Sequence, residues 1–182
     1  MRNNLIRELR SLAPNRALDL TEALRVAELQ AEALLKMSDV AMPPFPDRVI
    51  TSLPRIRVVR TDLATIASAA RWSHGAWMIL LNWKDIPARQ RFSLVHQVKH
   101  IIDWPQRETL YPVAFGPAAR KIAEQSADHF AGSVLMPESW LDRCMAMGLS
   151  TPNELSVQLG VSPAAIRVRL ASVGNRAGQL TP

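Results

Sequence analysis

Apolar residues recur every three to four positions over residues 17–36, the spacing that places them on one face of an α-helix. Asp19 precedes the periodic residues and Glu22 follows three positions later, which is typical of a capping box at a helix N-terminus. Two further stretches open near a proline and end before another, and they predict helices at residues 87–104 and 117–135. These three helices are the longest elements that the pattern predicts.

Between the first two helices lie three short β-like stretches, at residues 56–59, 65–67 and 77–81. Proline, aspartate and glycine separate them, as at the turns of a sheet. Three strands this close in sequence predict a small antiparallel sheet. With the helix at 87–104 under this sheet and the other helices packed around it, we expect an α+β fold.

The C-terminal segment predicts a separate pair of short helices. Residues 153–159 are typical of a helix that ends at a tight turn on Gly160, and a second helix begins after Ser162 as its N-cap. This is a helix-turn-helix pattern. We therefore divide the chain into a larger unit at residues 1–149 and a helical appendage at residues 150–182.

Composition fits an ordinary globular protein: of 182 residues, 48% are hydrophobic and 21% are charged. The longest apolar run, residues 76–81, is too short to cross a bilayer. The N-terminus carries no secretory signal pattern, and the single Cys144 cannot form an internal disulfide, in keeping with a reducing compartment. We expect a cytoplasmic protein with no membrane partner.

The formal net charge of +6 raises the question of a nucleic-acid partner. The excess is carried by arginines dispersed between residues 48 and 91, which favours a solvated basic face over attraction to an acidic partner. In the appendage only Arg167, Arg169 and Arg176 supply positive charge, too few phosphate contacts for strong binding alone. For this segment we prefer substrate recognition or packing to DNA contact.

His96 and His100 lie four residues apart within the predicted helix at 87–104. This spacing places both imidazoles on one face, where they can coordinate one zinc ion without distortion of the backbone. Histidine pairs also arise by chance on helices, so the pair alone leaves a metal site and an unliganded face equally open.

A second pair with the same spacing, Glu124 and Asp128, lies in the predicted helix at 117–135. Glu124 can complete a set of two histidines and one glutamate that leaves the fourth zinc position open. Asp128 can accept the second ring proton of a ligating histidine, preferably His96, and fix its tautomer. A charged helix face is the alternative for the carboxylates, but the two pairs together favour the metal site.

Residues 91–100, RFSLVHQVKH, resemble the active-site helix of the ImmA/IrrE family of zinc peptidases, and residues 124–137, EQSADHFAGSVLMP, are similar to its second signature. Two linked motifs in this order make the resemblance specific, and it covers most of the chain from the first predicted helix onward. It implies a thermolysin-like, gluzincin arrangement with Zn²⁺ held by His96, His100 and Glu124.

Gln97 stands where these peptidases carry a glutamate, which takes a proton from zinc-bound water and passes it to the leaving amine. A neutral amide has no usable proton affinity near neutral pH. Loss of a general base lowers rates by about 10²- to 10⁴-fold, so the chain is expected to be nearly inactive with zinc binding retained. Gln97 is either an engineered substitution that traps an inactive enzyme or the mark of a natural pseudoenzyme. The intact remainder of the site favours the first.

Tyr111, the only tyrosine, lies between the two motif helices. Its hydroxyl is a candidate for stabilising an oxyanion close to the metal. Packing against the core is the favoured interpretation.

The resemblance implies a zinc endopeptidase, because members of the family relieve repression by cutting a helix-turn-helix repressor in stress responses or mobile-element control. The expected partner is therefore a protein substrate, a DNA-binding transcriptional repressor. The alternative is a catalytically silent regulator that binds a repressor or DNA without cleaving it.

Overall fold

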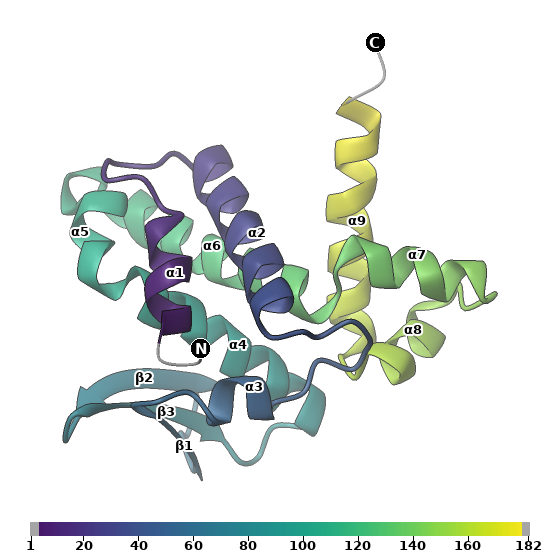
Figure 1. Ribbon diagram of the computed structural model, residues 1–182, viewed down its shortest axis with the longest axis horizontal. Coiled ribbons are helices and arrows are strands. Elements are labelled where there is room, and N and C mark those ends of the chain that lie inside the picture. The colour runs from purple at the N-terminus through teal and green to yellow at the C-terminus, as the bar shows by residue number, and fades with distance from the viewer. Residues whose placement is uncertain (1–3, 180–182) are drawn as a thin grey trace.

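The computed structural model describes the backbone of residues 4–179 and the side chains of residues 4–173. Helices gather over a small three-stranded sheet, and the C-terminal helix extends away from them (Figure 1). In chain order the elements are α1 (Leu5–Ser11), α2 (Leu20–Met37), α3 (Arg48–Thr51), β1 (Ile56–Thr61), β2 (Ser68–Ser73), β3 (Ala76–Asn82), α4 (Pro87–Asp103), the 3-10 helix η2 (Trp104–Gln106), α5 (Arg107–Leu110), the 3-10 helix η3 (Val113–Phe115), α6 (Pro117–Leu135), α7 (Glu138–Ala146), α8 (Pro152–Leu159) and α9 (Pro163–Gln179).

The three long helices predicted from the apolar pattern are confirmed as α2, α4 and α6. The capping box at the start of α2 is present, with the Asp19 side chain accepting from the Glu22 N–H at 2.8 Å. Helix α4 packs against β2 and β3 and against α6, and α6 packs along α2. Val95 and Val98 of α4 and Phe130 of α6 are fully buried in the resulting core. Helix α4 therefore joins the sheet to the helical layer.

The α+β class is confirmed, but the expectation of an all-antiparallel sheet is wrong. The strand order is β1-β3-β2, so β3 lies in the centre and β1 pairs parallel to it, with Val58 opposite Ile79. The prediction assumed that strands consecutive in the sequence also pair in the sheet, which holds in about two-thirds of cases. Here β1 and β2 are consecutive but do not pair. Here β3 is the most continuously apolar strand, and the central position buries Ile79 and Leu81.

The second strand lies at Ser68–Ser73 rather than at the predicted residues 65–67. It forms an antiparallel hairpin with β3, in which Ser73 lies opposite Ala76. The two connecting residues, His74 and Gly75, have φ values of 51° and 74°, as in the tight turns that match the twist of paired strands. The turn therefore sets the register between β2 and β3. It also explains why residues 68–73 form a strand although they contain no β-branched residue.

The predicted pair of C-terminal helices is confirmed as α8 and α9, and Ser162 Oγ accepts from the Ala165 N–H. Gly160 ends α8 with a φ of 67°, and a Cβ at this position would collide with the Arg91 guanidinium. Glycine therefore lets Arg91 Nη1 reach the Gly160 carbonyl at 2.9 Å. The division of the chain at residue 150 stays a prediction, and residues 180–182 lie outside the described part.

Within residues 4–179, none of the helices combines the length and the hydropathy that a membrane crossing requires.

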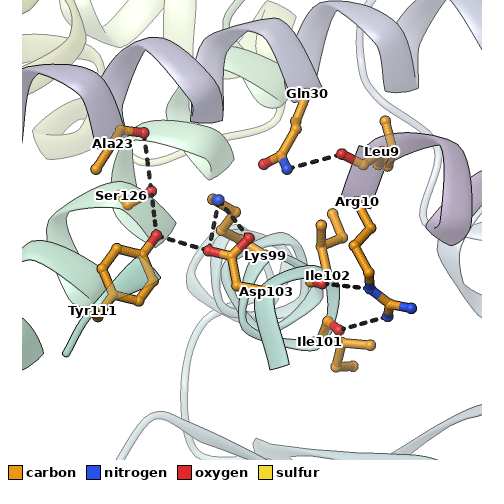
Figure 2. Close-up of polar contacts among 10 residues, drawn as sticks. All are labelled: Leu9, Arg10, Ala23, Gln30, Lys99, Ile101, Ile102, Asp103, Tyr111 and Ser126. Carbon is orange, nitrogen blue, oxygen red and sulfur yellow. Dashed lines mark hydrogen bonds and ion pairs between the residues drawn. The ribbon is translucent and has the colours of Figure 1, made fainter. Parts of the chain in front are cut away.

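A charged pair lies buried at the C-terminal end of α4 (Figure 2). Lys99 Nζ contacts both carboxylate oxygens of Asp103 at 2.8 and 2.7 Å. Tyr111 donates its hydroxyl to Asp103 at 2.8 Å and to Ser126 of α6 at 3.4 Å, and Ser126 donates to the Ala23 carbonyl of α2. Burial lowers the pKa of Lys99, opposed by Asp103. This network connects α4 to α2 and α6.

Helix α1 holds the same end of α4 from another side (Figure 2). Arg10 donates to the carbonyls of Ile102 and Ile101 at 3.0 and 3.4 Å, in the last turn of α4. A cation there also complements the negative end of the helix dipole. The orientation of α4 is thus fixed by polar contacts as well as by apolar packing.

Substitution of Asp103→Asn is predicted to lower the free energy of unfolding by about 3 to 5 kcal/mol, because the buried Lys99 ammonium loses its counter-charge. The double variant Lys99→Met with Asp103→Asn removes both charges at similar volume, so we expect it to recover most of the loss. Urea unfolding of both proteins measures the difference. A double variant less stable than Asp103→Asn alone would contradict the role of the pair.

Candidate metal centre

Two helices bring a group of three metal-ligating side chains together in the described part of the chain. His96 and His100 of α4 and Glu124 of α6 each offer one ligand atom, and these atoms lie within 4.8 Å of one another. The Nε2 atoms of the two histidines are 3.0 Å apart. Glu124 places one carboxylate oxygen 3.4 Å from His96 Nε2 and the other 3.6 Å from His100 Nε2.

These separations fit a zinc site. A tetrahedral zinc ion with ligands at about 2.0 to 2.1 Å holds neighbouring ligand atoms about 3.3 Å apart. The two histidine Nε2 atoms, 3.0 Å apart, are close to this value, and each of them has one of the two Glu124 oxygens nearby, at 3.4 and 3.6 Å. Two imidazoles and one carboxylate are also the donor set of catalytic zinc sites that keep one position open.

Asp128 lies one helical turn beyond Glu124, and its Oδ1 is 2.8 Å from His96 Nδ1. A proton on Nδ1 that is held by Asp128 leaves Nε2 free to coordinate a metal. His96 is the partner expected for Asp128 from the sequence, and the two side chains are in contact in the structure.

The electrostatics of the group favour a cation. Burial lowers the pKa of His96, but hydrogen bonds and charge interactions with Asp128 and Glu124 outweigh it and raise the pKa to about 9. His100 and His96 hold the pKa of Glu124 well below its usual range. The raised pKa favours a second ring proton, on Nε2 of His96, when no metal is bound, and metal binding must displace that proton.

The ligand group opens into a cavity of about 700 Å³ between the sheet and the two helices. Ser68, Ala69 and Ala70 of β2 form part of its lining, opposite Glu124 and Asp128 of α6. Strand β2 is an edge strand of the sheet. The candidate metal position therefore lies beside a strand edge with room for a further molecule.

Gln97 lines the same cavity with only 8% of its surface exposed. Its Nε2 donates to Ser68 Oγ at 2.9 Å, which connects α4 to β2. The amide can hydrogen-bond to water or to a substrate, but it cannot accept a proton near neutral pH. The position that would hold a general base thus carries a neutral side chain that fits its surroundings.

Tyr111 lines the cavity, yet its hydroxyl lies in the buried network with Asp103 and Ser126. Burial and Asp103 raise the pKa of Tyr111 above its usual value, so the hydroxyl stays protonated and donates to Asp103. This placement favours support of α4 over stabilisation of an oxyanion.

The two arginines of the appendage whose side chains the structure describes, Arg167 and Arg169, lie in different surroundings. Arg169 is buried and donates through Nε to the Met136 carbonyl at 3.1 Å, beyond the end of α6. Arg167 is exposed, and the side chain of Arg176 lies outside the described residues. Arg169 therefore holds α9 against α6 instead of offering its charge to nucleic acid.

Sequence reasoning missed Ser68 and the pair Lys99 and Asp103. The register of β2 places Ser68 next to Gln97, and no local sequence pattern indicates that register. The spacing of Lys99 and Asp103 was visible, but an i, i+4 pair of opposite charges usually indicates an exposed helix face.

Residues 53–171 match the peptidase family model described as the IrrE N-terminal-like domain. The matched segment includes the sheet, α4 and α6, and therefore every candidate ligand. No curated protein sequence matches the chain.

The protein is predicted to bind one zinc ion per chain, and His100→Ala is expected to lower this to well below one because a third of the ligand set is lost. Elemental analysis after dialysis against limiting zinc measures the stoichiometry. His129→Ala removes a histidine outside the ligand group and serves as the matched control. Equal zinc content in the two variants would show that the metal binds elsewhere.

Proposed function

Since the chain belongs to the IrrE N-terminal-like family of metallopeptidases, we propose that it binds one zinc ion at His96, His100 and Glu124 and holds a polypeptide beside it. We further propose that hydrolysis of that polypeptide is nearly abolished by Gln97. The observation that carries the proposal is the convergence of the three ligand atoms within 4.8 Å at a cavity bordered by a strand edge.

The polypeptide lies along β2. This strand pairs with β3 on one side, and its other edge is unpaired within the described residues. An extended peptide can add to such an edge through main-chain hydrogen bonds. Because Ser68, Ala69 and Ala70 line the cavity, a peptide on this edge passes the candidate metal position.

When bound, zinc polarises a peptide carbonyl and lowers the pKa of a coordinated water. The residues of the chain have separate tasks around that chemistry. Asp128 holds the Nδ1 proton of His96, so that Nε2 is directed to the metal. A general base must then carry a proton from the water to the leaving amide nitrogen, and Gln97 cannot do so. Binding is thereby separated from cleavage.

The proposed substrate is a helix-turn-helix transcriptional repressor, the substrate class implied by the resemblance to ImmA/IrrE peptidases. Cleavage of such a protein would relieve repression when position 97 carries a glutamate.

A second candidate function is a regulator that binds its partner without cutting it. The contact between Gln97 and Ser68 suits this candidate, because the amide has a partner on the neighbouring strand at 2.9 Å. An ionised glutamate could keep the contact only by accepting from the Ser68 hydroxyl, which reverses the direction of the hydrogen bond.

The two functions make different predictions for Gln97→Glu. A peptidase is expected to gain about 10²- to 10⁴-fold in cleavage rate, because the general base is restored. The measurement is the appearance of new N-termini, read by mass spectrometry, in a proteome-derived peptide library incubated with the zinc-loaded protein.

The control for this experiment is the double variant Gln97→Glu with His100→Ala, which lacks a metal ligand and is expected to stay inactive. If zinc-loaded, folded Gln97→Glu protein cleaves no more than the unsubstituted chain, the peptidase proposal fails and the binding function remains.

A further inference from the structure

A second cavity of about 660 Å³ lies between α9 and the helices that carry the metal ligands. Its walls include Ile86 and Phe92 at the start of α4, Gly132 of α6, and Ala165 and Val168 of α9. We call it the α9 groove. Ile86 and Val168 are large apolar side chains with 60% and 72% of their surface exposed, so the groove presents apolar surface to solvent.

Two polar contacts hold the walls of the α9 groove in place. Arg91 of α4 donates to the Gly160 carbonyl at 2.9 Å, in the turn before α9. Arg169 of α9 donates to the Met136 carbonyl at 3.1 Å. Because α9 is tied to both α4 and the end of α6, the groove is already formed before a ligand binds.

The α9 groove lies next to the cavity of the metal centre and shares lining residues with it. Arg89, Phe92 and Asp128 line both cavities. Asp128 also contacts His96 at 2.8 Å, so the two cavities meet beside a candidate metal ligand. The groove therefore lies beside the position that a chain bound at the metal would occupy.

We propose that the α9 groove binds the part of the polypeptide that lies to one side of the bond held at the metal, and that it selects large apolar side chains there. This inference rests on the proposed function, because it takes the metal cavity as the anchor point of the polypeptide. The groove suits an apolar segment, since burial of leucine-sized side chains against Ile86 and Val168 removes apolar surface of both partners from water. The appendage then contributes substrate specificity.

Zinc-anchored peptides test the proposal with the protein as it stands, because Gln97 prevents their turnover. One probe is acetohydroxamate alone, which reports the metal site. The others join a hydroxamate to Leu-Ala-Leu-Lys or to Asn-Ala-Asn-Lys, with the hydroxamate at either end of the peptide. Asparagine is close to leucine in size but polar. Isothermal titration calorimetry on zinc-loaded protein gives each Kd.

In one of the two orientations, the leucine peptide is expected to bind about 10- to 100-fold more tightly than the asparagine peptide. Val168→Glu places a charge on the groove wall and is expected to remove most of this preference while leaving the Kd of acetohydroxamate unchanged. Ala164→Glu, at an exposed groove position on the same helix, is expected to act in the same way.

Val157→Glu is the matched control, because Val157 is an 85% exposed valine on α8 that is not among the residues lining the α9 groove. It is expected to retain the full preference for leucine. Circular dichroism confirms that each variant is folded.

The outcomes separate the groove from the metal site. Tight acetohydroxamate binding with no leucine preference in either orientation overturns the groove proposal alone. A preference for the leucine peptide that persists in the folded Val168→Glu and Ala164→Glu variants also overturns the groove proposal alone. A change in oligomeric state of Val168→Glu without a change in peptide affinity assigns the groove to a second copy of the chain and overturns the proposal. No binding of any hydroxamate overturns the proposed function together with it.

Discussion

The structure depends on the packing of α4 against α6. Each helix carries its polar pair at positions four residues apart, His96 and His100 on one and Glu124 and Asp128 on the other. An i, i+4 pair points in one direction from its helix, so two helices in contact can direct four side chains to one point. Apolar packing around Val95 and Phe130 sets this geometry, and the candidate metal ligands converge only because that packing holds.

Polar contacts with three other parts of the chain also fix the position of α4. Lys99 and Asp103 connect its C-terminal end to Tyr111, Gln97 connects its middle to β2, and Arg91 connects its first turns to the appendage. Buried polar contacts cost free energy when they are unsatisfied, so each of them restricts how α4 can be placed. The proposed sites for a metal, a strand and an apolar segment therefore share one helix, α4.

Much of this arrangement was accessible from the sequence, because it depends on spacing within single elements. The long helices and the capping box at Asp19 follow from local periodicity, and the common face of each polar pair follows from i, i+4 geometry. The parallel pairing of β1 was not accessible, since it depends on which strand takes the centre of the sheet. The contact of Gln97 with Ser68 depends on a register set by the turn at His74 and Gly75. The α9 groove depends on the docking of α9, which rests on contacts between residues far apart in the chain.

The central claim is that α4 and α6 jointly hold one metal ion, and anomalous diffraction at the zinc edge from crystals of the zinc-loaded protein tests it most directly. The account predicts a single strong peak about 2.0 to 2.1 Å from Nε2 of both His96 and His100 and about 2.0 to 2.2 Å from the Glu124 carboxylate. A zinc peak bound elsewhere, or one coordinated by the histidines with Glu124 turned away, would contradict it.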